Sequence, residues 1–351
     1  MKILVGMSGG VDSTVAAALL KEQGHDVVGA MMTIWDGQYG TPVKKHACYG
    51  PDEAEDLEEA AEAAKAIGIP FHRFHLAKEY REIVVDDFRA EYLSARTPNP
   101  CVRCNHRLKF GLLPEAARRA GVSFDRFATG HYARIGSDAG GFHLRKGRDA
   151  KKDQSYFLYR LTQEQLSHAL FPLGDMTKDE VRAHARRLKL VAADKGESQD
   201  FYSGDYRELI GVGEMKGEIV TADGRVVGEH SGLWNFTPGQ RRGLGVSARE
   251  PLYVVKLDAG TNRVVVGSRE SSSASAFTLR ECVWIGAPPV NAALKVRLRS
   301  NAAELDCVVD SHDDTLASVT LAAPTLFAAP GQSAVFYDRD RVAGGGIIGE
   351  R

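Results

Sequence analysis

Residues 6–13 are Gly6-Met7-Ser8-Gly9-Gly10-Val11-Asp12-Ser13, between the apolar run Ile3-Leu4-Val5 and an alanine-rich segment from Thr14 to Gln23. This order predicts a strand, a tight glycine turn and the start of a helix. Glycine lets the backbone turn sharply and approach a ligand closely. The N–H groups at a helix start, with the helix dipole, favour an anion. The hydroxyls of Ser8 and Ser13 can add donors, and Ser13 or Asp12 can cap the helix. We therefore predict a phosphate or pyrophosphate site.

The same residues exclude two other phosphate loops. No Gly-Lys-Ser/Thr follows, so the segment is not a Walker loop, and the Gly-x-Gly-x-x-Gly dinucleotide pattern is absent. The segment resembles the Ser-Gly-Gly-x-Asp-Ser PP-loop of the N-type ATP pyrophosphatases. That resemblance implies ATP binding, adenylation of a carbonyl oxygen and release of pyrophosphate. The alternative is an ordinary glycine-rich turn. It is the weaker interpretation, because six specified positions match the PP-loop pattern and the segment lies between a predicted strand and a predicted helix.

Length and composition set the broad class of the protein. The chain has 351 residues, 43% hydrophobic and 26% charged, which is ordinary for a soluble protein of two or three domains. No apolar run approaches about 20 residues, and the first residues do not form a signal peptide. We expect a cytoplasmic protein with no membrane partner. The net charge is −1, yet residues 96–160 hold 14 Lys and Arg against 5 Asp and Glu, which can mark a polyanion-binding face.

Alternating patterns predict an α/β N-terminal domain. Strands are expected at residues 2–7, 26–32, 70–75 and 124–129, and helices at 14–23, 53–67, 78–95 and 108–120. Repeated βα units predict a parallel sheet covered by helices, with ligands beyond the carboxyl ends of its strands. The PP-loop, Met32 and Gly130 fall at those ends. After about residue 200, short alternating runs separated by glycine turns predict an all-β part.

The five cysteines are an odd number, which argues against a disulfide framework. Cys282 and Cys307 lie in apolar β-like runs and are expected to be buried. Cys101 and Cys104 form a Cys-x-x-Cys at residues 96–105, where two prolines predict a rigid, non-helical turn. Such a pair can be a redox pair, half of a metal site, a nucleophile with its resolving partner, or simply packing. Nearby arginines are expected to lower the thiol pKa, namely Arg96, Arg103 and Arg107.

Further stretches extend the resemblance along the chain. They are Thr97-Pro98-Asn99-Pro100, Cys104-Asn105, Lys109-Phe110-Gly111, Ala128-Thr129-Gly130-His131-Tyr132-Ala133, Lys152-Asp153-Gln154-Ser155, Ser198-Gln199-Asp200, Pro238-Gly239-Gln240-Arg241 and Pro330-Gly331-Gln332. Together with the PP-loop, they resemble the tRNA-specific 2-thiouridylases, the MnmA/TrmU family, over essentially the full length. The resemblance implies ATP-dependent 2-thiolation of the wobble uridine of tRNA through an adenylated base, with Mg²⁺ accompanying ATP.

The resemblance also implies an architecture and a set of contacts. A PP-loop domain of the adenine nucleotide alpha hydrolase type (1–200) precedes a small, mainly β central domain (201–272) and a C-terminal β-barrel that helps to grip tRNA (273–351). ATP contacts fall on Gly6, Met7, Ser8, Gly9, Gly10, Val11, Asp12, Ser13, Met32 and Gly130. Contacts to tRNA fall on Asn99, Pro100, Cys101, His131, Lys152, Asp153, Gln154, Arg299 and Gln332. Cys104 falls on the nucleophilic cysteine, with Cys101 and Asp12 as further catalytic candidates, Asp12 for orienting the PP-loop or its metal.

Two departures from the family pattern leave the sulfur chemistry open. Many members have Asp where this chain has Cys101, and Tyr202 stands where the family has a second cysteine that carries the incoming sulfur. In one interpretation, Cys101 and Cys104 divide the persulfide and resolving roles. In another, Cys101, Cys104 and Cys48 hold an iron–sulfur cluster, such as [4Fe–4S], that delivers sulfide. In the third, the protein binds tRNA and ATP but no longer thiolates.

The expected partners are tRNA and a sulfur donor, which is a sulfur-carrier protein, a cysteine desulfurase or sulfide. The alternative enzyme is another PP-loop ligase that forms an amide or a guanidine. Such a ligase needs an ammonia or amino-acid site, which the sequence does not reveal, and it leaves the Cys-x-x-Cys unexplained. The alternative outside enzymes is a tRNA-binding module whose chemistry ended with the change to Tyr202.

Overall fold

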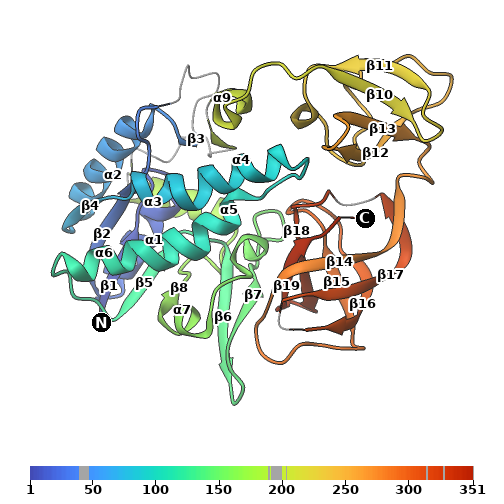
Figure 1. Ribbon diagram of the computed structural model, residues 1–351. Helices are drawn as coiled ribbons and strands as arrows, with labels where there is room; N and C mark the ends of the chain where they lie inside the picture. The colour runs from blue at the N-terminus through green and yellow to red at the C-terminus, as the bar shows by residue number, and fades with distance from the viewer. Residues whose placement is uncertain are drawn as a thin grey trace. The chain divides into compact units, whose positions relative to one another are not determined.

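The computed structural model describes residues 1–38, 47–188, 190, 200–202, 204–313, 315–326 and 329–350. Contacts divide the chain into two compact units. Figure 1 shows their helices and strands, coloured by residue number. Unit 1 comprises Met1–Val84, Cys101–Asp205 and Asp340–Val342, and unit 2 comprises Val85–Pro100, Tyr206–Arg339 and Ala343–Arg351. The three-domain division at residues 1–200, 201–272 and 273–351 stays a prediction.

Unit 1 is built on a parallel sheet with the strand order β4-β2-β1-β5-β8. Its strands are β1 (Lys2–Gly6), β2 (Asp26–Thr33), β4 (Phe71–His75), β5 (Arg126–Thr129) and β8 (Ala169–Leu170). Ile3, Leu4 and Val5 of β1 are fully buried, as expected for a central parallel strand that is covered on both faces. The predicted parallel α/β sheet is therefore confirmed.

The helices of unit 1 pack on this sheet and on one another. They are α1 (Val11–Glu22), α2 (Glu53–Ile67), α3 (Ala77–Tyr80), α5 (Pro100–Arg103), π-helical η2 (Cys104–Leu112), α6 (Leu113–Arg119), 3-10 helical η3 (Ser155–Leu158), α7 (Gln163–His168) and α8 (Lys178–Arg187), while π-helical η1 (Arg81–Val85) leads into unit 2. The alanine-rich sequence of α1 lets it bury two faces. Val5 and Ala17 belong to a core with α2, and Val11 and Val15 belong to a second core with α8.

Two smaller strand pairs complete unit 1. A hairpin joins β6 (Ala133–Asp138) to β7 (Gly141–Lys146). The second pair is parallel and consists of β3 (Ala47–Tyr49) and β9 (Asp200–Tyr202), with Tyr49 opposite Tyr202. The pair therefore places residues 47–49, which follow β2 in the sequence, beside residues 200–202.

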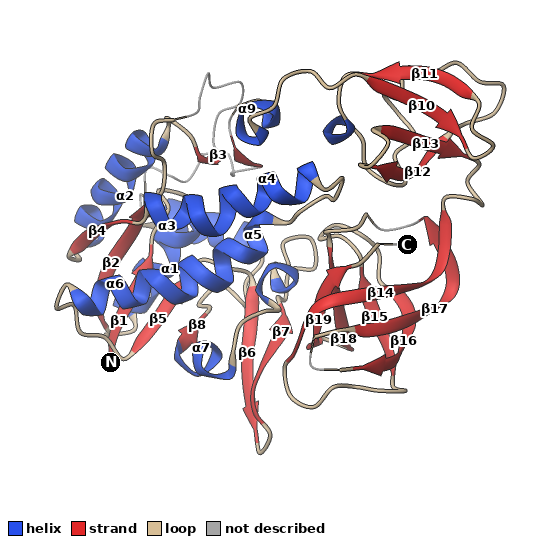
Figure 2. Ribbon diagram, in the orientation of Figure 1, coloured by secondary structure: helices blue, strands red, loops and turns tan. Residues whose placement is uncertain are grey.

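Unit 2 is dominated by strands, shown in red in Figure 2. Its helices are α4 (Asp86–Leu93), α9 (Tyr206–Ile210) and 3-10 helical η5 (Leu233–Asn235). A sheet of order β11-β10-β13-β12 contains β10 (Gly217–Thr221), β11 (Val226–His230), β12 (Tyr253–Asp258) and β13 (Arg263–Gly267).

The remaining strands of unit 2 form a closed barrel. They run in the order β14-β17-β16-β15-β18-β19, and β19 pairs back with β14. The strands are β14 (Ser273–Trp284), β15 (Ala293–Arg297), β16 (Leu305–His312), β17 (Ala317–Leu326), β18 (Ser333–Asp338) and β19 (Arg341–Ile348). Val296, Val309 and Phe336 fill the interior, where Cys282 and Cys307 are buried as predicted. The predicted C-terminal β-barrel is confirmed.

One local prediction was wrong. The segment around the Cys-x-x-Cys is not a non-helical turn, because α5 begins at Pro100 and continues through η2 into α6. Proline at the first position of a helix loses no hydrogen bond, so Pro100 starts the helix instead of preventing it. Cys101 and Cys104 therefore lie one helical turn apart.

Candidate functional site

The PP-loop connects β1 to α1 at the carboxyl edge of the sheet. Gly10 precedes α1, and no side chain caps the helix, so the predicted cap by Ser13 or Asp12 was wrong. The Ser13 hydroxyl instead donates to the Gly10 carbonyl (3.2 Å) and accepts from the Ser8 N–H (3.1 Å). Because no capping side chain competes for the first N–H groups of α1, this helix start suits an anion.

Two glycines of the site are required by close backbone packing. Gly9 has φ +71°, and a Cβ there would lie 2.7 Å from the carbonyl oxygen of Asp56. A Cβ on Gly130 would lie 2.6 Å from the backbone nitrogen of Ser13. Because Gly6 also pairs with Thr129 across β1 and β5, the Thr129-Gly130 segment lies directly against the PP-loop. The predicted convergence of these two segments at one sheet edge is confirmed.

The other predicted ATP contacts differ in exposure. Ser8 is exposed, whereas Met7 and Val11 are buried in the two cores, so only their backbone groups can face a ligand. Met32 is half-buried near the carboxyl end of β2, two residues beyond the Ala30 that pairs with Gly6. All ten predicted ATP-contact residues belong to unit 1.

The carboxylate of Asp12 is held by two residues that the sequence analysis missed. Lys178 Nζ lies 2.8 Å from both Asp12 carboxylate oxygens, and the Tyr132 hydroxyl donates to Oδ1 at 2.8 Å. Gln154 in turn holds Tyr132, because its Oε1 accepts from the Tyr132 N–H at 2.9 Å. Asp149 accepts from the Lys178 N–H (3.0 Å) at the start of α8. Asp12 thus joins the PP-loop to α8. Its role in orienting the PP-loop or its metal stays a prediction.

Replacing Lys178 with methionine should destabilise unit 1. Lys178 is buried, and the change removes its ion pair with the Asp12 carboxylate, which keeps the hydrogen bond from the Tyr132 hydroxyl. The free energy of unfolding should fall by about 1–3 kcal/mol. Urea denaturation measures this loss. The matched control is Lys78→Met, which removes an exposed i,i+4 pair with Glu82 at 3.9 Å and should change stability by less than about 0.5 kcal/mol. Equal urea midpoints for Lys178→Met and wild type would contradict the role assigned to this ion pair.

The Cys104 thiol does not have the lowered pKa that the sequence suggested. Burial raises the pKa of Cys104 to about 11, while the positive charge of Lys109 acts in the opposite direction. The residue as a whole remains partly exposed. Of the three arginines expected to act, Arg96 belongs to unit 2 and pairs there with Glu91 at 2.9 Å. The prediction of a lowered pKa was wrong because desolvation outweighs the nearby positive charge.

Lys109 connects the cysteine helix electrostatically to the PP-loop region. Burial lowers the pKa of His131 well below its usual range, and Lys109 lowers it further. The same lysine also acts on Cys104. The ring centroids of Phe110 in η2 and His131 lie 5.9 Å apart, so the cysteine helix and the Gly130-His131 segment are neighbours. The thiol and the predicted anion site thus lie in one region of unit 1.

The raised pKa of Cys104 should appear in the rate of alkylation by iodoacetamide. Only the thiolate reacts, so with a pKa of about 11 the rate should rise roughly tenfold per pH unit from pH 8 to about pH 11. Peptide mass spectrometry follows each cysteine separately, and the exposed Cys48 should be alkylated first. The internal control is Cys307, whose pKa burial raises to about 12. A Cys104 rate that levels off below pH 9 would refute this prediction.

Three cysteines influence the pKa of one buried tyrosine. Burial raises the pKa of Tyr80 well above its usual range, and Cys104, Cys48 and Cys101 each add to the rise. Cys48 also raises the pKa of Cys104. The predicted cluster ligands are therefore neighbours, and Cys48 lies close to the Cys-x-x-Cys.

The cysteines as placed do not form the predicted iron–sulfur site. Within the described ranges, no group of three or more His, Cys, Asp and Glu side chains is arranged to hold a metal ion. The donor chemistry suits a cluster, but the arrangement does not. Among the described residues, protein side chains alone therefore form no Mg²⁺ site. Mg²⁺ that accompanies a nucleotide is normally held by phosphate oxygens together with one or two carboxylates.

The predicted tRNA contacts are divided between the units. His131, Lys152, Asp153, Gln154 and Cys101 belong to unit 1, and Asn99, Pro100, Arg299 and Gln332 to unit 2. His131 is buried and shares a 2.7 Å hydrogen bond with Thr129. The Asp153 carboxylate accepts from the Gly147 and Ser155 N–H groups. The Gln332 amide donates to the Thr97 and Pro98 carbonyls. These roles in tRNA binding stay predictions, as does the family motif at Ser198 and Gln199, which lies outside the described residues.

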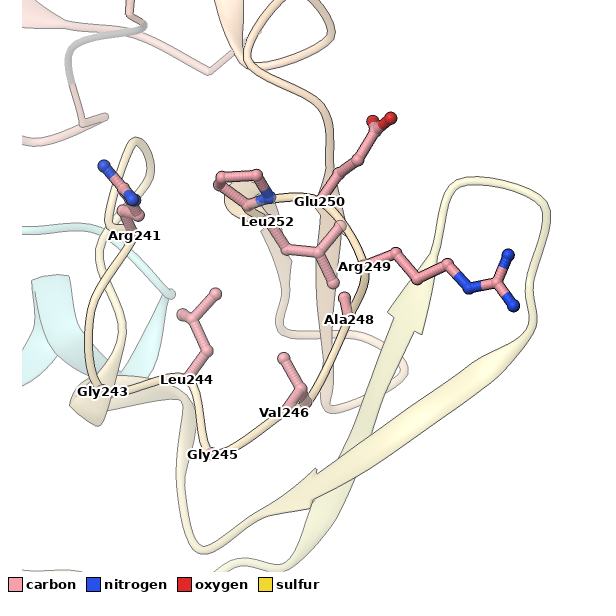
Figure 3. A pocket seen from close by; sticks show the side chains of 10 residues that line it. Arg241, Gly243, Leu244, Gly245, Val246, Ala248, Arg249, Glu250 and Leu252 are labelled. Atoms are coloured by element: carbon pink, nitrogen blue, oxygen red, sulfur yellow. The ribbon is translucent and has the colours of Figure 1, made fainter.

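Unit 2 contains a pocket of about 370 Å³, which is lined by none of the predicted ATP-binding, tRNA-binding or catalytic residues but includes Arg241 of the Pro238-Gly239-Gln240-Arg241 stretch. The loop from Arg241 to Leu252 forms its walls, and Leu244, Val246 and Leu252 lie around it (Figure 3). Separately, among the described residues no helix is both long and apolar enough to cross a membrane.

Together, the PP-loop at the head of a parallel sheet, the neighbouring cysteine helix and the C-terminal barrel define a PP-loop protein with an added β-barrel. A family profile described as "tRNA methyl transferase HUP domain" matches residues 1–202. The profiles "tRNA methyl transferase PRC-barrel domain" and "Aminomethyltransferase beta-barrel domain" match residues 210–268 and 274–348.

Curated relatives narrow this class to one family. The tRNA-specific 2-thiouridylase MnmA of Endomicrobium trichonymphae is 45% identical over 358 residues, covering 99% of both chains. That of Geobacter metallireducens is 45% identical over 361 residues, covering 99% of this chain and 96% of its own. The chain belongs to the tRNA-specific 2-thiouridylase family. A solved structure of a 4-thiouridine synthetase–RNA complex with bound ATP is 15% identical to this chain, with a TM-score of 0.35, and the match covers 59% of this chain and 49% of that one.

Proposed function

We propose that the protein catalyses the ATP-dependent 2-thiolation of the wobble uridine of tRNA. Relatives that bear the name tRNA-specific 2-thiouridylase align with it from end to end. The observation that carries the proposal is the position of Cys104, which shares Lys109 as an electrostatic neighbour with the His131 segment, next to the Gly130 that packs on the PP-loop. A reactive sulfur site beside a pyrophosphate site is what this reaction needs.

In the proposed reaction, ATP activates the base and sulfur then replaces oxygen. The C2 carbonyl oxygen of uridine attacks the α-phosphorus of ATP, and pyrophosphate leaves with the electron pair of the broken P–O bond. Sulfur then attacks C2, and AMP leaves with the former carbonyl oxygen. The N–H groups at the start of α1 stabilise the departing pyrophosphate. The base must leave the anticodon stack to reach these groups.

ATP and Mg²⁺ are the proposed cofactors, and Mg²⁺ would neutralise phosphate charge when bound. Both Asp12 oxygens lie against Lys178 in this arrangement. Asp12 is therefore assigned to orienting the loop. Lys178 adds a positive charge next to the Asp12 carboxylate. No step of the proposed chemistry is assigned to the ion.

Cys104 is the proposed reacting cysteine, with Cys101 one turn before it on the same helical segment. The partners are tRNA and a sulfur donor, in the cytoplasm. Delivery of sulfide by an iron–sulfur cluster is the alternative route, and it requires Cys48, Cys101 and Cys104 to converge on one cluster. Iron and acid-labile sulfide assays on anaerobically purified protein distinguish the routes, because the absence of both eliminates the cluster.

Release of pyrophosphate separates the candidate functions. The proposed thiolase releases it only when tRNA with a wobble uridine is added, and the matched control is the same tRNA with cytidine at that position. Release without tRNA would indicate another PP-loop ligase. No release with either tRNA would indicate a protein that binds tRNA without chemistry, the alternative suggested by Tyr202.

A further inference from the structure

Position 202, at the end of β9, does not carry a reactive side chain in this protein. Tyr202 is fully buried, and its ring centroid lies 6.1 Å from that of Tyr49. Tyr49 in turn stacks on Tyr80 at 5.2 Å. The three rings form a packed core layer. A phenol in such a layer cannot carry sulfane sulfur, so any relay needs another thiol.

Strand pairing brings one cysteine next to this position. In the parallel pair β3–β9, Ala47 lies opposite Asp200 and Tyr49 opposite Tyr202. Cys48 therefore lies on the adjacent strand, directly before the residue that faces position 202. Side chains alternate along a strand, so the Cys48 side chain faces away from the buried Tyr49 and from Tyr202 opposite it, and it is exposed. An exposed thiol is accessible to an external sulfur donor.

Cys48 is also a neighbour of the proposed reacting cysteine. It raises the pKa of Cys104, and both residues raise that of Tyr80. One thiol of this pair is exposed, and the other lies deeper in the protein. A sulfur relay requires this arrangement, because an exposed thiol can accept sulfur from a donor and a more buried thiol can then release it near the substrate.

We propose that Cys48 carries the incoming sulfur in place of the missing cysteine at position 202 and that Cys104 resolves it. The proposal rests on the proposed thiolase function. First, a low-molecular-weight or protein persulfide transfers its outer sulfur to the Cys48 thiolate, which becomes a persulfide, and the donor leaves as a thiolate. Next, the Cys104 sulfur attacks the inner sulfur of that persulfide. The persulfide S–S bond breaks, a disulfide forms between Cys48 and Cys104, and the thiol proton of Cys104 leaves with the outer sulfur as HS⁻.

The remaining steps close the cycle. HS⁻ attacks C2 of the adenylated uridine, the C–O bond to AMP breaks, and loss of the sulfur-bound proton gives the thiocarbonyl. The two cysteines have been oxidised by two electrons, which reduced the sulfane sulfur to sulfide. A dithiol reductant then returns Cys48 and Cys104 to thiols. Cys101 is not oxidised in this cycle.

The test is a single turnover without reductant. Protein, ATP, Mg²⁺, unmodified tRNA and glutathione persulfide are mixed, and disulfides are mapped by mass spectrometry under non-reducing conditions. We expect one disulfide between Cys48 and Cys104 for each 2-thiouridine formed. Product accompanied by a disulfide between Cys101 and Cys104, or by no disulfide, overturns the proposal.

Variants provide a second readout. Cys48→Ser should form product from the persulfide at least about a hundredfold more slowly than wild type, and inorganic sulfide should restore it, because HS⁻ bypasses the relay. The control is Cys282→Ala, a change in the barrel that should keep the wild-type rate. A wild-type rate for Cys48→Ser with persulfide overturns the relay alone. Failure of the wild-type protein with both persulfide and sulfide overturns the thiolase function and the relay together.

Discussion

Replacing Cys104 with serine is expected to lower 2-thiouridine formation from a persulfide donor by at least about a thousandfold, the scale of loss when a nucleophile is removed. Serine keeps the size and the polarity of the side chain, but its oxygen cannot attack a persulfide and release sulfide. Single-turnover assays with nucleoside analysis measure the change. Burial raises the pKa of Cys104 to about 11, so the resting thiol is protonated and its proton leaves with the released sulfide.

A folding control accompanies this variant. Cys104 lies at the start of η2 and is partly exposed, so serine should cost little stability, and thermal melting checks that the fold is kept. Inorganic sulfide should restore product formation in Cys104→Ser, as in Cys48→Ser. A Cys104→Ser protein that thiolates from persulfide at the wild-type rate would remove Cys104 from the mechanism.

Replacing Gly130 with alanine is expected to lower tRNA-dependent pyrophosphate release by at least about a hundredfold, because displacement of a reacting group by about 1 Å has that cost. The new Cβ would lie 2.6 Å from the Ser13 nitrogen and 2.7 Å from the Asp12 carbonyl carbon. Both are backbone atoms at the start of α1, so no side chain can rotate to make room. The PP-loop must move, and its N–H groups move with it.

The matched control is Gly213→Ala. No atom lies within 4 Å of a Cβ at that position, so pyrophosphate release should stay within about twofold of wild type and stability within about 0.5 kcal/mol. Measuring kcat/KM for ATP in both variants isolates the effect of the contact. Wild-type kcat/KM in Gly130→Ala would show that the PP-loop tolerates the displacement and would contradict its assignment to the pyrophosphate.

Local patterns were sufficient for much of the fold. The helix at residues 53–67 is found with the predicted bounds, because Gly68 adopts the left-handed conformation that ends it. The parallel sheet followed from apolar runs and from the βα order. The helix at the Cys-x-x-Cys was missed because Pro100 was interpreted as a breaker, although it stands at the first helical position.

Long-range contacts of the site were beyond the sequence analysis. The Thr177–Glu180 capping box marks the start of α8, but nothing local indicates that Lys178 reaches Asp12, 166 residues away. β3 has three residues, too few for a periodic pattern, and it exists through its pairing with β9. The thiol pKa was misjudged for a similar reason, since charge can be counted in a sequence and burial cannot.

Nucleoside mass spectrometry decides whether the protein is a thiolase. Anaerobically purified protein, ATP, Mg²⁺, unmodified tRNA and inorganic sulfide are combined, without any sulfur-carrier protein. We predict 2-thiouridine at the wobble position, with none when ATP is omitted, because sulfide bypasses the relay and only the PP-loop chemistry remains. Absence of 2-thiouridine from a protein that binds both ATP and tRNA would contradict the proposed function and would identify a tRNA-binding homologue without thiolation chemistry.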